Sequence, residues 1–133
     1  MIFDTILLGS RRVLEFAGRC QAKKVLFASS GAVYGAQPSD LTHIPETYAG
    51  APSIHLPSSS YGEAKRAAEL MGNLYSKVHG FEFKTARCFA FVGPHLAPFG
   101  SYAIGNFILD AIKKRPLEIK GDGKLASGEA RGC

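Results

Sequence analysis

The order of apolar segments constrains the fold of this chain more than any other feature of its sequence. A short apolar run at residues 23–30 is followed by a loop rich in Pro, Ser, Thr and Gly at 36–57, an amphipathic segment at 61–79 and a second strand-like run at 81–92. A continuous apolar run of this length is typical of a strand buried on both faces of a parallel sheet. Strand, loop, helix and strand in this order predict a right-handed parallel crossover and therefore an α/β fold.

Further elements are expected on both sides of this unit. Residues 2–19 carry apolar side chains at helical spacing, and a helix is expected at about 104–114, where Pro116 ends it. Residues 117–120 alternate like a short strand. Residues 124–133 have almost no apolar content, so we expect them to be disordered.

The start of the 61–79 segment carries the first candidate for chemistry. Pro57 and the serine run at 58–60 indicate a helix start, with a serine oxygen as its cap. Tyr61 and Lys65 are one helical turn apart and therefore share a face of the helix. An ammonium beside a phenol favours the phenolate, which can then exchange protons with a substrate. The alternative is an ordinary amphipathic helix with a surface tyrosine and lysine.

A second candidate follows the first expected strand. Ser29 and Ser30 close the apolar run and precede the turn Gly31–Gly35. Ligands of open α/β sheets bind beyond the carboxyl ends of the strands, so these hydroxyls lie where a site is expected. The alternative is a strand end whose serines only satisfy backbone groups.

The charge of the chain does not favour nucleic acid as a partner. The net charge is +5, but the basic residues lie mostly near the ends of expected helices, where they favour the helix dipole. Aromatic residues are not interleaved with them as in a base-stacking surface. An anionic small molecule is the more economical partner.

The cysteines and histidines exclude further classes. The three cysteines, Cys20, Cys88 and Cys133, are far apart and odd in number, which is typical of a reducing compartment and argues against a disulfide framework. The four histidines lack metal-ligand spacing, so no metal site is expected. The sequence shows no secretory signal and no apolar run long enough to cross a membrane, and we expect a cytoplasmic protein.

Three motifs together carry a family resemblance. The segments Ser29–Gly35, Tyr61–Lys65 and Arg87–Pro94 resemble the extended short-chain dehydrogenases/reductases, and most closely the NAD-dependent epimerase/dehydratase family that modifies nucleotide sugars. The resemblance covers roughly residues 2–123. It implies the C-terminal half of a Rossmann-like, doubly wound parallel sheet and the start of a small substrate domain.

The resemblance also implies roles for individual residues. Tyr61 would be the acid/base that moves the sugar hydroxyl proton, and Lys65 would bind the nicotinamide ribose and favour the phenolate. Ser30 would hydrogen-bond the reacting oxygen and complete the catalytic and cofactor-binding set. Phe89 would lie beside the nicotinamide of NAD, and Asn106 would contact the diphosphate of the substrate.

Several departures from the family pattern bear on activity. The glycine-rich turn that binds the cofactor pyrophosphate is not found, so we expect an internal portion of such an enzyme that is inactive by itself. Residues 1–94 would be a partial NAD-binding domain and 95–123 the start of the substrate-binding region. Gly31 and Ala32 stand where nucleotide-sugar 4,6-dehydratases typically carry acids, which favours epimerase-like or reductase-like chemistry. Ala90 replaces an asparagine that contacts substrate in many members.

Two function classes remain open from the sequence. The first is the catalytic part of an NAD-dependent nucleotide-sugar epimerase or of a related dehydratase or reductase, with NADP not excluded as cofactor. The second is a truncated, non-catalytic relative that acts as a binding module. The resemblance implies a homodimer of the full-length protein through the 61–79 helix. A nucleotide sugar is the expected partner, and neither nucleic acid nor a membrane is expected.

Overall fold

The computed structural model describes residues 1–93, 95 and 103–117. Residues 1–89 form one compact unit, and the described residues from Ala90 onward belong to a second; each is treated by itself. In chain order the elements are α1 (Ile2–Arg19), β1 (Lys24–Ser30), the 3₁₀ turns η1 (Gly31–Tyr34) and η2 (Pro57–Ser59), α2 (Ser60–His79), β2 (Glu82–Cys88) and α3 (Ala103–Ile112).

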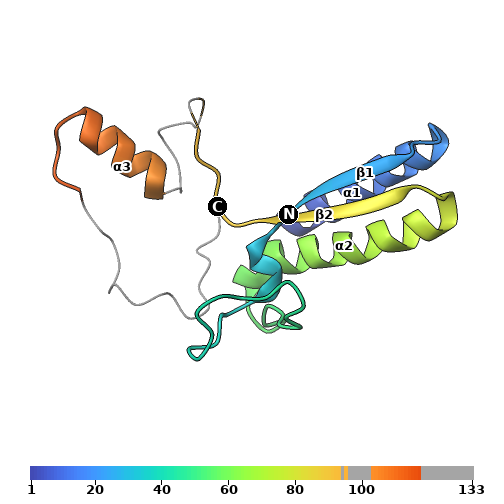
Figure 1. The fold of residues 1–133 in the computed structure, drawn as a ribbon, viewed down its shortest axis with the longest axis horizontal. Coiled ribbons are helices and arrows are strands. Elements are labelled where there is room, and N and C mark those ends of the chain that lie inside the picture. Colours follow the sequence, from blue (N-terminus) through green and yellow to red (C-terminus); the bar gives the residue numbers. More distant parts are fainter. Residues whose placement is uncertain (94, 96–102, 118–133) are drawn as a thin grey trace. The chain divides into compact units, whose positions relative to one another are not determined.

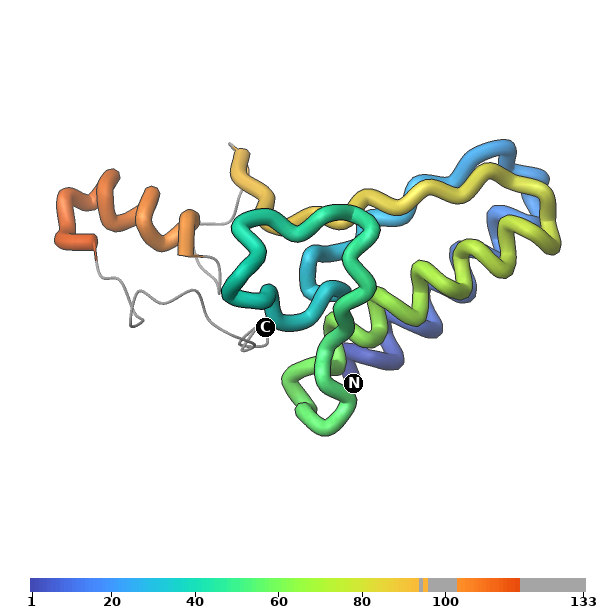
Figure 2. The backbone as a smooth tube through the Cα atoms, turned by 60° about the horizontal axis from the view of Figure 1, so that its bottom comes forward, coloured from blue at the N-terminus to red at the C-terminus, as the bar shows by residue number. Residues whose placement is uncertain are grey.

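The two strands of the first unit are parallel. Their register runs from Lys24 opposite Glu82 to Ser30 opposite Cys88. Both strands therefore end at the same edge of the sheet, and the loop at 35–57 lies at that edge (Figure 2). The expectation of an α/β fold with two parallel strands joined through a helix is confirmed.

Helices α1 and α2 lie side by side on one face of the sheet (Figures 1 and 2). In β1 the residues that point to this face, Val25, Phe27 and Ser29, are less exposed than their neighbours. The expectation of a strand buried on both faces is wrong for the described residues, because helices cover one face alone and Leu26 is 73% exposed on the other. The apolar run reports the strand correctly but not what covers it.

The core lies between the two helices and the sheet. Leu14, Ala17 and Phe81 are buried there and pack against a rim of half-buried apolar side chains, namely Ala22, Val25, Met71, Tyr75 and Phe83. Small residues let α2 approach its neighbours closely, since Ala64 and Ala68 are fully buried. Gly72 also allows a close approach, because an added Cβ at this position would overlap the ring of Phe83.

Two of the glycines inside the helices, Gly72 and Gly9, are expected to respond oppositely to alanine. Gly72→Ala should destabilise the chain by about 1–3 kcal/mol, because the methyl group must displace the Phe83 ring. Gly9→Ala in α1 should stabilise it by about 0.5–1 kcal/mol, because position 9 is exposed, has open space around it and lies in a helix interior. Urea unfolding of both variants measures the difference. Equal effects would contradict the close packing of α2 on β2.

The prediction for the start of α2 is wrong, and the prediction for its end is confirmed. A serine cap was expected, but Ser59 makes no side-chain capping hydrogen bond. The backbone of η2 takes over this task, because the amides of Ser59 and Ser60 donate to the carbonyls of Leu56 and Pro57. At the other end, Gly80 adopts the left-handed conformation (φ 76°) and its amide donates to the Ser76 carbonyl, as expected of a glycine stop.

The second strand is shorter than the sequence indicates. A strand was expected at 81–92, but β2 ends at Cys88, because its partner β1 ends at Ser30 and turns into η1. Helix α3 matches the helix expected at 104–114 within two residues at each end. The strand expected at 117–120 lies, apart from Leu117, outside the described residues, as does the tail 124–133.

Candidate active site

Tyr61 and Lys65 lie together on the first two turns of α2. The Nζ atom of Lys65 is 6.0 Å from the centroid of the Tyr61 ring, so the two side chains share a face as their spacing predicts. The same Nζ donates a hydrogen bond of 2.9 Å to the Ala28 carbonyl and lies 5.1 Å from the centroid of the Phe27 ring. Lys65 thus joins the tyrosine to β1, near the end of that strand.

Lys65 also lines an open cavity of about 310 Å³ between α1 and β1. It is the one charged side chain among the described residues that line this cavity, the others being mainly apolar. An ammonium in such surroundings needs hydrogen-bond acceptors, and the Ala28 carbonyl supplies one of the three that it can use.

Ser30 ends β1 with an extended backbone and caps the turn that follows. Its Oγ accepts a hydrogen bond of 3.2 Å from the Ala32 amide. A hydroxyl that accepts in this way still has its own proton to donate. The neighbouring Ser29 points to the helix face and is 5% exposed, so the two serines lie in different surroundings. The hydrogen bonds of the described residues do not include one between Ser30 and Tyr61.

A glycine brings the tyrosine helix to the turn that follows Ser30. A Cβ at position 62 would lie 2.7 Å from the Ala32 carbonyl oxygen and 2.9 Å from the ring of Pro52. The first turn of α2 therefore lies directly against η1, which keeps Tyr61 near the end of β1.

Gly62→Ala is expected to push α2 and η1 apart and to destabilise the chain by about 1–3 kcal/mol, because a backbone oxygen cannot move aside as a flexible side chain can. Urea unfolding measures the change, with Gly9→Ala as a control of the same chemistry in open space. Stabilisation of both variants would contradict the contact.

Aromatic rings gather beyond the strand ends. Phe89 stacks on Tyr34 with ring centroids 6.3 Å apart, and Tyr34 lies 6.2 Å from Tyr48 of the long loop. Phe89 also covers Gly31, where any Cβ would overlap its ring. Tyr34 is buried, whereas Phe89 is 72% exposed. An apolar ring is thus presented to solvent beside Ser30 and its turn.

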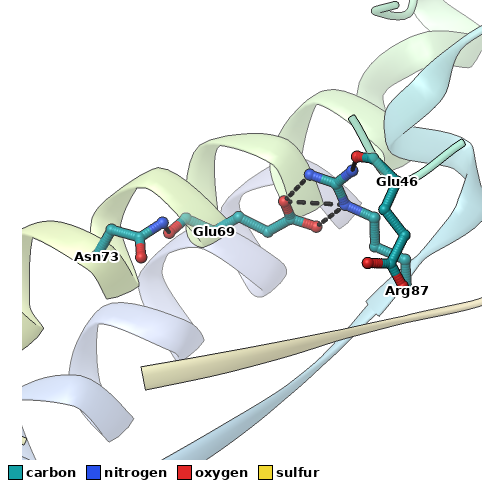
Figure 3. Close-up of polar contacts among 4 residues, drawn as sticks. All are labelled: Glu46, Glu69, Asn73 and Arg87. Atoms are coloured by element: carbon teal, nitrogen blue, oxygen red, sulfur yellow. Dashed lines mark hydrogen bonds and ion pairs between the residues drawn. The ribbon is translucent and has the colours of Figure 1, made fainter. Parts of the chain in front are cut away.

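A partly buried ion pair links β2 to the same helix (Figure 3). Arg87 donates to both carboxylate oxygens of Glu69, at 2.8 Å from Nη2 and 3.1 and 3.2 Å from Nε. Its Nη1 donates to the Glu46 carbonyl at 3.4 Å, and its guanidinium carbon lies 4.6 Å from the centroid of the Tyr34 ring. Burial raises the pKa of Glu69, but hydrogen bonds, chiefly from Arg87, more than offset it, so the pKa lies below its ordinary value.

Glu69 and Arg87 were not assigned a role from the sequence, although a signal was present. Glu69 follows Tyr61 and Lys65 at the same helical spacing, so it lies one turn further on the same face. Arg87 interrupts an otherwise apolar strand end. An acid and a base that both fall on buried faces indicate an ion pair, because a charge is rarely buried alone.

Asn106 lies on α3, in the second unit of the chain. Its expected contact with a diphosphate stays a prediction. Within the described part of the chain, no helix is both long and apolar enough to span a membrane. The described residues likewise contain no group of three or more His, Cys, Asp or Glu side chains arranged to hold a metal ion.

Comparison with known proteins identifies the family. The family model described as "NAD dependent epimerase/dehydratase family" matches residues 2–126. The chain is 34% identical over 121 residues to UDP-glucuronic acid decarboxylase 1 of Arabidopsis thaliana, covering 90% of this chain and 27% of the relative.

Solved structures give the same result. UDP-glucose 4-epimerase of Thermotoga maritima matches with a TM-score of 0.78 and 27% identity over 92% of this chain and 38% of its own. The dTDP-glucose 4,6-dehydratase of Bacillus anthracis, in complex with NAD, matches with a TM-score of 0.73 and 25% identity over 91% and 36%. The chain therefore spans about a quarter to two fifths of the proteins that it matches. It has the Rossmann-type α/β fold of these enzymes and belongs to the NAD-dependent epimerase/dehydratase family.

Proposed function

We propose that this chain carries the proton-transfer residues of an NAD-dependent nucleotide-sugar enzyme that transfers a hydride at a sugar carbon. The observation that supports this most is the position of Lys65, held between the Tyr61 ring and the backbone of β1 near its carboxyl end. A cation at this place favours the phenolate of Tyr61. The carboxyl end of a parallel strand is also where open α/β sheets bind their ligands.

The groups near Tyr61 fit the nicotinamide end of NAD, which is the cofactor of the family. The Lys65 ammonium uses one of its three N–H groups on Ala28, so it retains donors for ribose hydroxyls. The exposed ring of Phe89 offers an apolar surface beside Ser30 for a planar ring. When bound, NAD supplies the hydride acceptor.

The remaining work belongs to the side chains. Tyr61 removes the proton from the sugar hydroxyl while the hydride leaves its carbon, and returns it when a keto group is reduced. Lys65 stabilises the phenolate that this requires. Ser30 donates a hydrogen bond from its hydroxyl to the reacting oxygen and so orients that oxygen. The Ala32 amide holds the Ser30 Oγ in place for this contact.

A nucleotide sugar is the substrate class that we propose. The relatives named above are, by their names, enzymes of UDP- or dTDP-linked sugars. Gly31 and Ala32 supply no carboxyl group next to Ser30, and the Phe89 ring covers Gly31. This favours epimerisation or reduction over 4,6-dehydration, which needs a further acid and base at the sugar. Asn106 would contact the diphosphate.

The proposal extends to organisation and assembly. Residues 1–94 would be part of the NAD-binding domain, and 95–123 would begin the substrate-binding region.

Large apolar side chains are exposed on the two helices, namely Leu8, Val13 and Phe16 on α1 and Leu70, Leu74 and Val78 on α2. Leu70, Leu74 and Val78 follow one another by one helical turn, and pairing of this face of α2 with a second copy would bury them in a homodimer. Cys20 and Cys88 are free thiols, in keeping with the cytoplasm.

The test is turnover by the protein that carries this chain, purified at its full length with NAD. UDP-, dTDP-, GDP- and CDP-sugars are supplied separately, and products are followed by mass and chromatographic retention. An epimer changes retention but not mass, a 4,6-dehydration loses water, and a decarboxylation loses carbon dioxide. Reductase activity is tested in a separate reaction that supplies NADH and a nucleotide keto-sugar, and it consumes both.

Turnover that depends on Tyr61 supports the proposal, and the product identifies the reaction. NAD binding without conversion of any nucleotide sugar would favour the alternative, a non-catalytic relative that acts as a binding module. Protection of the protein against thermal unfolding by NAD separates that case from one in which the cofactor does not bind.

A further inference from the structure

We infer that the Glu69–Arg87 pair is a positioning device that holds the long loop at 36–57 against the helix that carries Tyr61 and Lys65. The pair acts on the placement of the loop. Its consequence for turnover rests on the proposed function.

The acid of the pair belongs to the helix face of the candidate site. Glu69 follows Lys65 by one helical turn and Tyr61 by two, and it is 7% exposed. A carboxylate buried to this degree is stable where a charged partner satisfies it. Arg87 is that partner, and it lies one residue before the end of β2.

The base of the pair has a fixed orientation. Arg87 grips the carboxylate through Nε and Nη2, so the planar guanidinium cannot rotate without breaking both contacts. This orientation directs Nη1 to the Glu46 carbonyl and places the guanidinium over the Tyr34 ring. A single planar group thus joins α2, β2, η1 and the loop. Figure 3 shows its contacts with Glu69 and Glu46.

Three other ion pairs of the described residues differ from this one. Lys84 and Lys24 pair with Glu82 across the exposed surface of the two strands, and Arg11 pairs with Glu15 within α1. These pairs join groups that secondary structure already holds together. Arg87 instead reaches a loop residue 41 positions away, in a segment without regular structure.

The loop needs such an anchor because it ends where the catalytic helix begins. It approaches η1 closely, since Cβ atoms at Gly35 and Gly50 would overlap the Ala51 carbonyl and the Tyr34 carbonyl. It then leads through η2 into α2, whose first turn carries Tyr61. A contact that holds the Glu46 backbone in place therefore restrains the part of the loop that precedes η2 and Tyr61.

Arg87→Lys is the discriminating variant. A lysine ammonium still pairs with Glu69, but it lacks the fork that reaches Glu46 and the plane that stacks on Tyr34. Hydrogen exchange of backbone amides, followed by mass spectrometry on the whole chain, reports the loop and the strands separately. We expect the amides at 46–50 to exchange about tenfold faster in this variant, with those of β1 and β2 unchanged.

Two controls isolate the contact. Lys84→Met removes an exposed ion pair from the same strand and should leave loop exchange as it is. Glu46→Ala keeps the carbonyl that Arg87 uses and should also leave it unchanged. Equal loop exchange in Arg87→Lys and the parent chain would overturn the inference, as would acceleration of the loop and both strands together. Because exchange needs no turnover, failure here is distinct from failure of the proposed function.

Discussion

Replacement of Tyr61 by phenylalanine in the full-length protein is expected to lower turnover by about 10²–10⁴-fold, the usual contribution of a general acid/base. The change removes one oxygen and keeps the ring. Among the described residues the Tyr61 hydroxyl makes no hydrogen bond, and its ring is near Lys65. Loss of that oxygen should therefore spare the fold and the binding of NAD, so the effect should fall on the rate and not on the affinity for NAD.

Tyr75→Phe is the matched control on the same helix. Tyr75 is half-buried, and its hydroxyl donates to Glu15 of α1 at 3.4 Å, far along α2 from Lys65. We expect its turnover to stay within about twofold of the parent and its stability to fall by about 0.5–1.5 kcal/mol, the net value of one hydrogen bond. Full turnover in Tyr61→Phe, or equal losses in the two variants, would remove Tyr61 from the mechanism.

Arg87→Met is expected to have the largest effect on stability, a loss of about 2–3 kcal/mol near neutral pH. Methionine fills much of the space but leaves the Glu69 carboxylate buried without its charged partner. The loss should stay below that of a fully buried pair, because the Arg87 side chain is 32% exposed. Urea unfolding measures it. Lys84→Met, which breaks an exposed pair, should cost less than about 1 kcal/mol.

The effect of Arg87→Met should also depend on pH with a defined sign. In the parent chain the pKa of Glu69 is lowered, so its stabilisation is present above the unfolded-state pKa of about 4.3 and is lost as the pH falls further. In the variant, burial without Arg87 raises the pKa of Glu69. The folded protein therefore loses stability through Glu69 as the pH rises above the unfolded-state pKa. The difference between the two proteins should therefore be largest near neutral pH and shrink in acid. A constant difference would show that Glu69 is not the group concerned.

The local features of the fold could be predicted because they depend on residues close together in the sequence. The bounds of α1, the start of β1 and the glycine stop of α2 at Gly80 all follow from periodicity and backbone conformation. The spacing of Tyr61 and Lys65 likewise placed them on one helical face, and the structure brings them together. Their catalytic roles stay a prediction, as do those of Ser30, Phe89 and Asn106.

The errors concern features that a distant segment decides. The strand expected to continue to residue 92 ends at Cys88, because its length depends on where β1 stops pairing. The serine cap expected for α2 is replaced by backbone hydrogen bonds from η2, a turn that the loop creates. Leu26 is exposed although its run is apolar, because which face is covered depends on the two helices.

By itself the sequence determined the order of strands and helices, the parallel crossover and the family, since these follow from hydrophobic periodicity and from motifs whose residues are neighbours. The tertiary structure alone decided what surrounds the candidate site: the contact of Gly62 with the Ala32 carbonyl, the stacking of Phe89 on Tyr34, and the joining of Glu69, Arg87 and Glu46 by one guanidinium. These contacts join residues 18 to 55 positions apart. Such contacts form only when the fold brings the two residues together, so no local sequence pattern specifies the partner. For the ion pair, the physical reason is that a buried charge without a partner is costly.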